Sequence, residues 1–150
     1  MTQLLDPETA LLTGCAQLLA AAGAGTWQPD GLYPDDAECV ITLDLLPVKR
    51  QAIALRIVDD VPVDRSTTRY QLQALARVTP GAADGRRRVG LIRDAFHMRI
   101  SPPMPPGIRV TSLNVRTRGP LGRHGAWDEH SVNFTALAAR ASAWAGGAAY

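Results

Sequence analysis

The chain has 150 residues, of which 46% are hydrophobic and 20% are charged, and its formal net charge is +2. This length and apolar fraction fit one folded domain and exclude a disordered chain. No run approaches the roughly 20 apolar residues that a membrane span needs, and the start has no basic segment typical of a secretory signal. We expect a single cytoplasmic domain over residues 1–150, with an ordered core over about 5–140 and a loose C-terminal tail.

The first predicted element is a helix over residues 6–22. Asp6 suits the N-cap, Pro7 suits the first helical position, and Glu8 favours the positive end of the helix dipole. The apolar stripe and the glycine that ends it are Leu11, Cys15, Leu18, Ala22 and Gly23. We expect Cys15 and the other cysteine, Cys39, to be buried thiols, because two isolated cysteines define neither a disulfide framework nor a zinc site.

Three segments then alternate apolar and polar residues, which is typical of half-buried strands. They cover residues 38–47, 52–60 and 68–78, after a loop rich in Gly, Pro and Asp. The short connection between the first two predicts a hairpin. The third places Arg69 and Arg77 on its polar side, so one face of the sheet is expected to be wet.

A second helix is predicted over residues 81–98, with an apolar stripe at Val89, Ile92 and Phe96 and with Arg86 and Arg93 on a different face. His97 is expected to cap its C-terminal end. Residues 108–117 and 130–140 are predicted as two further strands, joined by a turn over the stretch 118–129. The order α-β-β-β-α-β-β predicts an α+β fold, with an antiparallel sheet of about five strands and two helices on one face.

The net charge hides a strong asymmetry along the chain. The first 64 residues hold ten acidic and three basic residues, a net charge of −7, whereas the remainder holds thirteen arginines and four acidic residues, a net charge of +9. Such halves fit an ordinary solvated protein, a subunit whose acidic side meets a neighbour's basic side, or a basic face turned toward nucleic acid.

One stretch, GPLGRHGAWDEHSVNF at residues 119–134, gathers residue types that could bind a metal: His124, Asp128 and His130. The spacing argues against a site, because His124 lies in a glycine-flanked turn whereas His130 starts a strand. No hydrolase or phosphate-loop motif accompanies them. We therefore predict no catalytic residue, no metal site and no cofactor.

As an ordered set, these segments resemble the tail terminator (minor capsid) proteins of long-tailed bacteriophages. The resemblance rests on a first helix, a strand pair and residues 67–97, TTRYQLQALARVTPGAADGRRRVGLIRDAFH. It continues through Arg116, a Pro120-Leu121-Gly122 turn and the closing strand Ser131-Val132-Asn133-Phe134. It covers roughly residues 5–140.

The resemblance implies a non-enzymatic virion protein that forms a hexameric ring at the head–tail junction. Such a ring caps the tail tube, contacts the head-completion or connector protein, and lets DNA pass through its lumen without sequence-specific binding; no membrane partner is implied. Heterologous contacts in a ring would use the charge asymmetry. The residues expected to make subunit or lumen contacts are Arg69, Arg77, Arg86, Arg87, Arg93, Arg116, Arg118 and Arg123.

Three alternatives stay open at this point. A head-completion or neck protein of the same interface has a similar size. A small metal-dependent enzyme would use His124, Asp128 and His130. A small basic nucleic-acid-binding domain is the third, and the scarcity of aromatic residues counts against single-strand binding.

Overall fold

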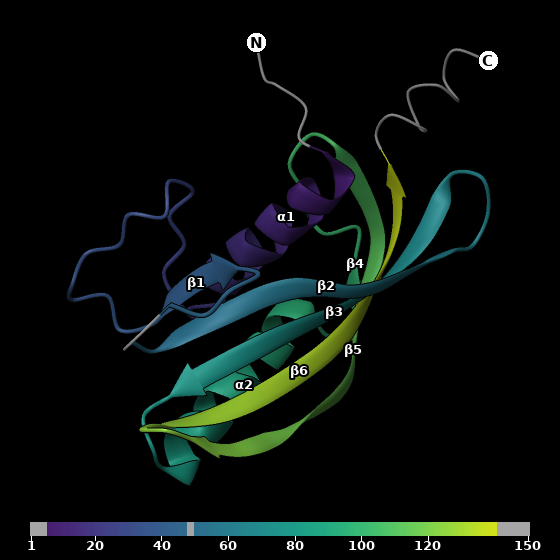
Figure 1. Cartoon of the computed structure of the whole chain (residues 1–150). Helices are drawn as coiled ribbons and strands as arrows, with labels where there is room; N and C mark the ends of the chain where they lie inside the picture. The colour runs from purple at the N-terminus through teal and green to yellow at the C-terminus, as the bar shows by residue number, and fades with distance from the viewer. Residues whose placement is uncertain (1–5, 48–49, 141–150) are drawn as a thin grey trace.

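The structure is a computed structural model that describes residues 6–47 and 50–140. Two helices and six strands follow one another (Figure 1): α1 (Pro7–Ala21), β1 (Val40–Leu43), β2 (Ala52–Pro62), β3 (Thr67–Val78), α2 (Ala82–Phe96), β4 (Arg99–Ile100), β5 (Ile108–His124) and β6 (Trp127–Arg140). The strands form one sheet in the order β1-β2-β3-β6-β5-β4. Within the described part, no helix is long and apolar enough to cross a membrane. The expected loose tail falls on residues 141–150, which lie outside this part.

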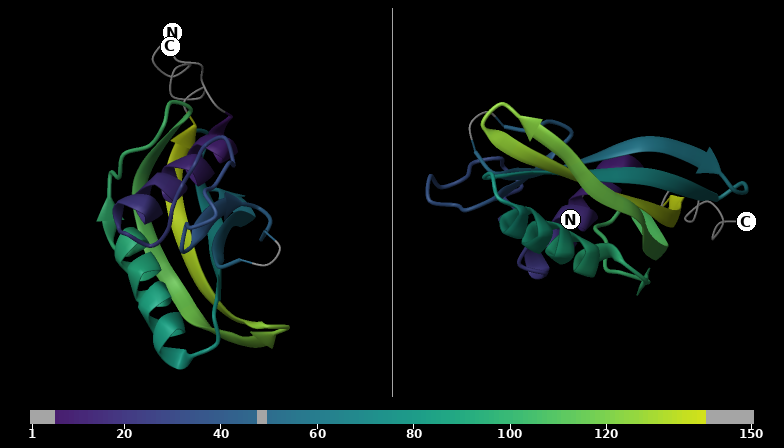
Figure 2. Two further views of the ribbon diagram at one scale, coloured as in Figure 1. Left: turned by 90° about the vertical axis from the view of Figure 1, so that its left-hand side faces the viewer. Right: turned by 90° about the horizontal axis from the view of Figure 1, so that it is seen from below.

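Both helices lie on the same face of the curved sheet, as predicted (Figure 2). We call this the helix-covered face and the other the open face. On β3 the even-numbered residues from Tyr70 to Val78 are buried under the helices, and the residues between them are exposed or half-exposed. At the centre, the rings of Phe96 on α2 and Phe134 on β6 stack with centroids 4.1 Å apart. The core therefore forms between one face of the sheet and the two helices.

Helix α1 begins where the sequence predicts. The Asp6 carboxylate accepts a hydrogen bond from the Thr9 backbone N–H, which satisfies one of the helix's unpaired amides. The segment between β4 and β5 crosses α1 closely at Gly14, where an added Cβ would stand 2.1 Å from the Met104 Sδ atom. A larger residue at this crossing would require the Met104 side chain to move.

Both cysteines are buried free thiols, as expected. Burial raises the pKa of Cys15 and that of Cys39. Neither thiol is therefore activated as a thiolate at neutral pH.

The predicted hairpin between the first two strands is wrong, because β1 pairs with β2 in parallel, with Val40 beside Ala52. The strand ends at Leu43, four residues before the predicted end at Pro47. Asp44 has a φ of 72°, which turns the chain out of the strand, and β2 begins at Ala52, beside the start of β1. The sheet is thus mixed and not wholly antiparallel.

The predicted turn over residues 118–129 is also wrong, since β5 and β6 continue through it as a long hairpin. The true turn is Gly125-Ala126, where Gly125 has a φ of 63°, a conformation that favours glycine. Bulges, including one between Pro120 and Gly122, absorb the residues that interrupt the alternation. The two-residue strand β4, absent from the prediction, pairs with β5 and becomes the sixth strand.

Candidate functional site

A polar hollow on the open face brings together two of the arginines singled out in the sequence. Arg69 on β3 and Arg116 on β5 lie on either side of β6. Amide and hydroxyl groups line the hollow between them, including those of Gln71, Thr117, Asn133 and Thr135. The Asn133 side-chain amide donates a hydrogen bond of 3.0 Å to Thr117 Oγ1. Two guanidinium groups above a neutral polar floor suit contact with an anionic surface.

A bulge in β5 separates Arg116 from Arg118. The pairing register shifts between Val115 and Thr117, so Arg116 and Thr117 both line the open face. Arg118 pairs opposite the buried Val132 and lies on the helix-covered side. Simple alternation along a strand would have placed Arg116 and Arg118 on the same face.

Arg118 lines a second hollow, between α2 and the β5–β6 hairpin. Its other lining residues are Arg86, Val89, Gly119, Pro120 and His130. The His130 ring lies so close to α2 that a Cβ added to Gly85 would stand 2.2 Å from its Nε2 atom. This hollow therefore combines largely apolar walls with the side chains of two arginines and a histidine.

The three residues that could have formed a metal site do not converge. The Asp128 carboxylate accepts hydrogen bonds from Arg123 Nε, at 2.7 Å, and from the Gly81 N–H at the start of α2, at 3.1 Å. These donors, Arg123 first, lower the pKa of Asp128. His124 lies exposed near the Leu121 carbonyl, and among the described residues no three His, Cys, Asp or Glu side chains are placed to hold a metal ion.

The remaining predicted contact residues are spread over the molecule. Arg77 Nη1 donates a 2.8 Å hydrogen bond to the Pro47 carbonyl, and its Nη2 lies 3.8 Å from Glu129 Oε1. Arg123 is engaged with Asp128, as described above. Arg93 lies exposed in the last turn of α2. The eight arginines therefore form no single patch, and their role in subunit or lumen contacts stays a prediction.

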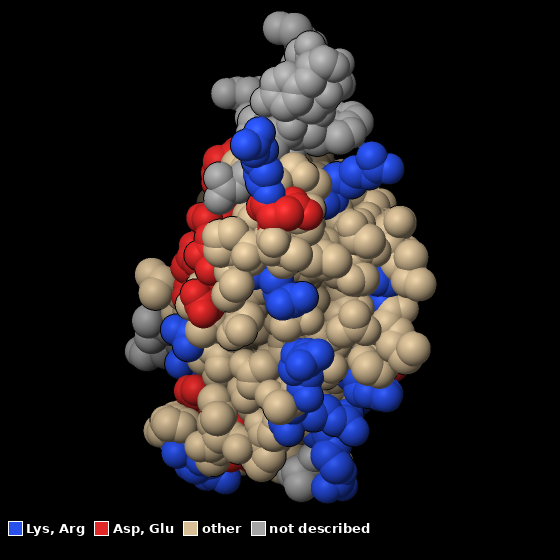
Figure 3. Space-filling model, turned by 90° about the vertical axis from the view of Figure 1, so that its right-hand side faces the viewer, with Lys and Arg blue, Asp and Glu red and all other residues tan. Residues whose placement is uncertain are grey.

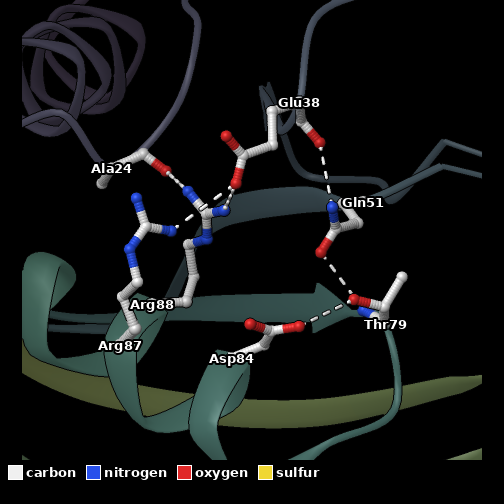
Figure 4. Close-up of polar contacts among 7 residues, drawn as sticks. All are labelled: Ala24, Glu38, Gln51, Thr79, Asp84, Arg87 and Arg88. Atoms are coloured by element: carbon white, nitrogen blue, oxygen red, sulfur yellow. Dashed lines mark hydrogen bonds and ion pairs between the residues drawn. The ribbon is translucent and has the colours of Figure 1, made fainter.

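Arg88 is a structural residue that the sequence analysis missed. Its guanidinium is almost fully buried and donates to the Ala24 carbonyl, at 2.5 Å, and to Glu38 Oε1, at 2.9 Å (Figure 4). Arg87, which was predicted to contact a partner, lies 3.5 Å from the same carboxylate oxygen but stays exposed. Arg88 precedes Ile92 by four residues, so helical spacing alone places it on the buried side of α2. It fastens the loop between α1 and β1 to α2.

Five of the ten acidic residues of the first half lie together at one place on the surface. Asp6, Glu8, Asp44, Asp59 and Asp60 line one hollow between the start of α1 and β2. In Figure 3, acidic atoms lie mainly along the upper left margin, whereas a group of basic atoms lies at the lower centre and right. The acidic hollow beside α1 and the arginines that line the hollow between α2 and the β5–β6 hairpin therefore lie at different places on the folded molecule.

Comparison with known proteins identifies a shared fold. No protein-family model matches the sequence, and no curated protein matches it. A chain in a structure described as the virion of a native gene transfer agent particle matches with a TM-score of 0.59 at 13% identity, over 89% of this chain and 97% of that one. A second solved chain, with a TM-score of 0.49 at 11% identity over 86% of this chain and 91% of that one, is too distant to support an argument. The first likeness shows that the two chains share their fold.

Proposed function

We propose that this protein is a structural subunit of a phage-like virion, a tail terminator that forms a ring on the tail tube and joins it to the head connector. The observation that carries the proposal is the fold shared with a chain of a gene transfer agent virion, which extends over nearly the whole of both chains. The proposal requires no catalytic centre, metal or cofactor.

The different positions of the acidic hollow and of the arginines are an argument for the proposed ring. In a ring, each subunit meets its neighbours through two different surfaces, which must complement each other. The acidic hollow beside α1 and the arginines of α2 and β5 supply surfaces of opposite sign on one chain. Complementary potentials of this kind set the orientation in which two subunits join.

The residues of the open face are an argument for the proposed passage of DNA through the lumen of the ring. Arg69 and Arg116 can meet phosphate groups, while the amides and hydroxyls between them contact a moving duplex without fixing its sequence. Contacts to the backbone alone carry no sequence information, as a conduit for the whole genome requires.

Tail tubes provide the direct test. Tubes would be assembled from the tail-tube protein of the same genome, with and without this protein, and examined by electron microscopy. We expect a ring at one tube end and an arrest of elongation, and light scattering on the material released from the tubes should give the mass of a hexamer. Tubes that stay bare and grow to the same length would contradict the assignment. Binding to head connectors but not to tubes would instead assign it to the neck.

A further inference from the structure

The sheet has two edges that are partly unpaired within the described residues. Strand β1 pairs with β2 only along Ala52–Leu55, so the outer side of β2 from Arg56 to Pro62 has no neighbouring strand. At the opposite edge, β4 is the last strand of the sheet. An unpaired edge exposes backbone N–H and C=O groups that another strand can bind.

These two edges lie at the same level of the sheet. Pairing across β3, β6 and β5 connects the unpaired part of β2 to β4 through two consecutive rows of residues. The first row is Asp60, Tyr70, Ala136, Leu113 and Arg99, and the second is Val61, Arg69, Leu137, Ser112 and Ile100. A row that begins with an aspartate therefore ends with an arginine on the same face, and the next row begins and ends with an aliphatic residue.

The side chains at the two ends are available for contact. Val61 is 41% exposed and Ile100 is 82% exposed, so the aliphatic side chain at each end of the second row is open to contact. Asp60 is exposed and Arg99 is half-exposed. Within these two rows, each edge thus offers one charged and one apolar side chain, and the two charges are opposite.

The residues that flank β4 have an uncommon backbone conformation. Met98 and Ser101, the residues on either side, have φ values of 53° and 48°, in the left-handed region that residues other than glycine rarely adopt. Such conformations persist where the surrounding structure maintains them, and they cluster at functional positions. Here the two left-handed residues limit β4 to two residues, one of which is the exposed Ile100.

The direction of the strands allows one copy to follow another. In the order of the sheet, from β2 through β3, β6 and β5 to β4, each strand is antiparallel to its neighbour. Strand β4 therefore runs in the same direction as β2. If a second copy stands beside the first in the same orientation, its β2 lies parallel to β4 of the first. That β4 then occupies the outer side of β2 in line with β1, which is also parallel to β2.

We propose that copies of this chain join head to tail by pairing β4 of one copy with the Arg56–Pro62 part of β2 in the next. Arg99 then faces Asp60, and Ile100 packs beside Val61. The contact joins two different edges, so it repeats in one direction from copy to copy and favours a ring over a symmetric dimer. This inference rests on the proposed function and specifies the contact between subunits.

Charge exchange tests the pairing. Asp60→Arg and Arg99→Asp would each be measured by light scattering over a range of protein concentrations, at low and moderate salt. We expect each variant to associate about tenfold more weakly than the wild type, because an attraction becomes a repulsion. An equimolar mixture of the two variants should associate again, since every contact then joins opposite charges. Asp35→Arg, in the exposed loop before β1, is the matched control and should assemble like the wild type.

The outcomes separate this inference from the proposed function. Circular dichroism melting would first show that the variants fold. A wild type that stays monomeric at every concentration, variants that assemble like the wild type, or a mixture that fails to recover would each overturn the edge pairing. Binding to tail tubes is measured independently, so a protein that caps tubes while its Asp60→Arg variant assembles normally retains the function and loses only this contact.

Discussion

On strand β6, Phe134 points toward the helices and stacks on Phe96, whereas the preceding residue, Asn133, lies on the open face and bonds to Thr117. The same alternation separates the two faces along most of the sheet. The helix-covered face holds the apolar core, and the open face carries amides, hydroxyls and arginines. Neighbouring residues on one strand therefore serve different ends: the covered face stabilises the fold, and the open face and the edges remain available for contacts.

The strongest test of this division compares adjacent residues of β6. Phe134→Ala should lower the free energy of unfolding by about 3–5 kcal/mol, because it removes the stacked ring and leaves a cavity in the core. Asn133→Ala should change it by less than about 1 kcal/mol, because only one hydrogen bond at the surface is lost. Urea denaturation of both variants measures the difference. Similar losses in the two would show that the open face also maintains the fold.

A smaller effect separates two consecutive arginines of α2. Arg88→Ala should cost about 2 kcal/mol, because the Ala24 carbonyl loses its buried donor and Glu38 loses its closest partner. Arg87 has a side chain that is 58% exposed, so Arg87→Ala should cost less than about 0.5 kcal/mol. Thermal unfolding would measure both. Equal losses would mean that the buried arginine does not fasten the loop between α1 and β1.

Two glycines of α2 should respond in opposite directions. Gly90 has no atom within 4 Å of an added Cβ, so Gly90→Ala should stabilise the helix by up to about 1 kcal/mol. At Gly85 the same methyl group would meet the His130 ring, so Gly85→Ala should be destabilising or neutral. Replacing His130 by Ala in the Gly85→Ala background should recover part of the loss. Equal stabilisation by both single substitutions would show that α2 and β6 are not in close contact here.

The sequence is sufficient to predict the helices and the covered face, because these depend on local patterns. The N-cap at Asp6, the stripe at Val89, Ile92 and Phe96, and the alternation of β3 all have the predicted positions. The parallel pairing of β1 with β2 cannot be predicted from a local pattern. It depends on the left-handed turn at Asp44 and on the hydrogen bond from Arg77 to the Pro47 carbonyl, which joins residues distant in the sequence.

The surfaces were harder to predict for a related reason. The bulges of β5 move Arg118 to the face opposite Arg116, and alternation gives no sign of them. The hydrogen bond between Arg88 and Glu38 joins residues fifty positions apart in the sequence. The arginines were therefore identifiable as a set, while their grouping into separate hollows required the strand register.

The smallest expected effect concerns the junction of α2 with the β5–β6 hairpin, where Asp128 accepts from Arg123 and from the Gly81 N–H. These hydrogen bonds lower the pKa of Asp128 below its ordinary value of 3.8. A lowered folded-state pKa contributes stability above that ordinary value, and this contribution is lost as the pH falls through the lowered pKa. Asp128→Asn should therefore unfold with a shallower dependence on pH below about 4 than the wild type. Arg123→Gln should give an intermediate dependence, since the Gly81 donor remains. Identical acid unfolding curves for all three proteins would show that the carboxylate does not join the hairpin to α2.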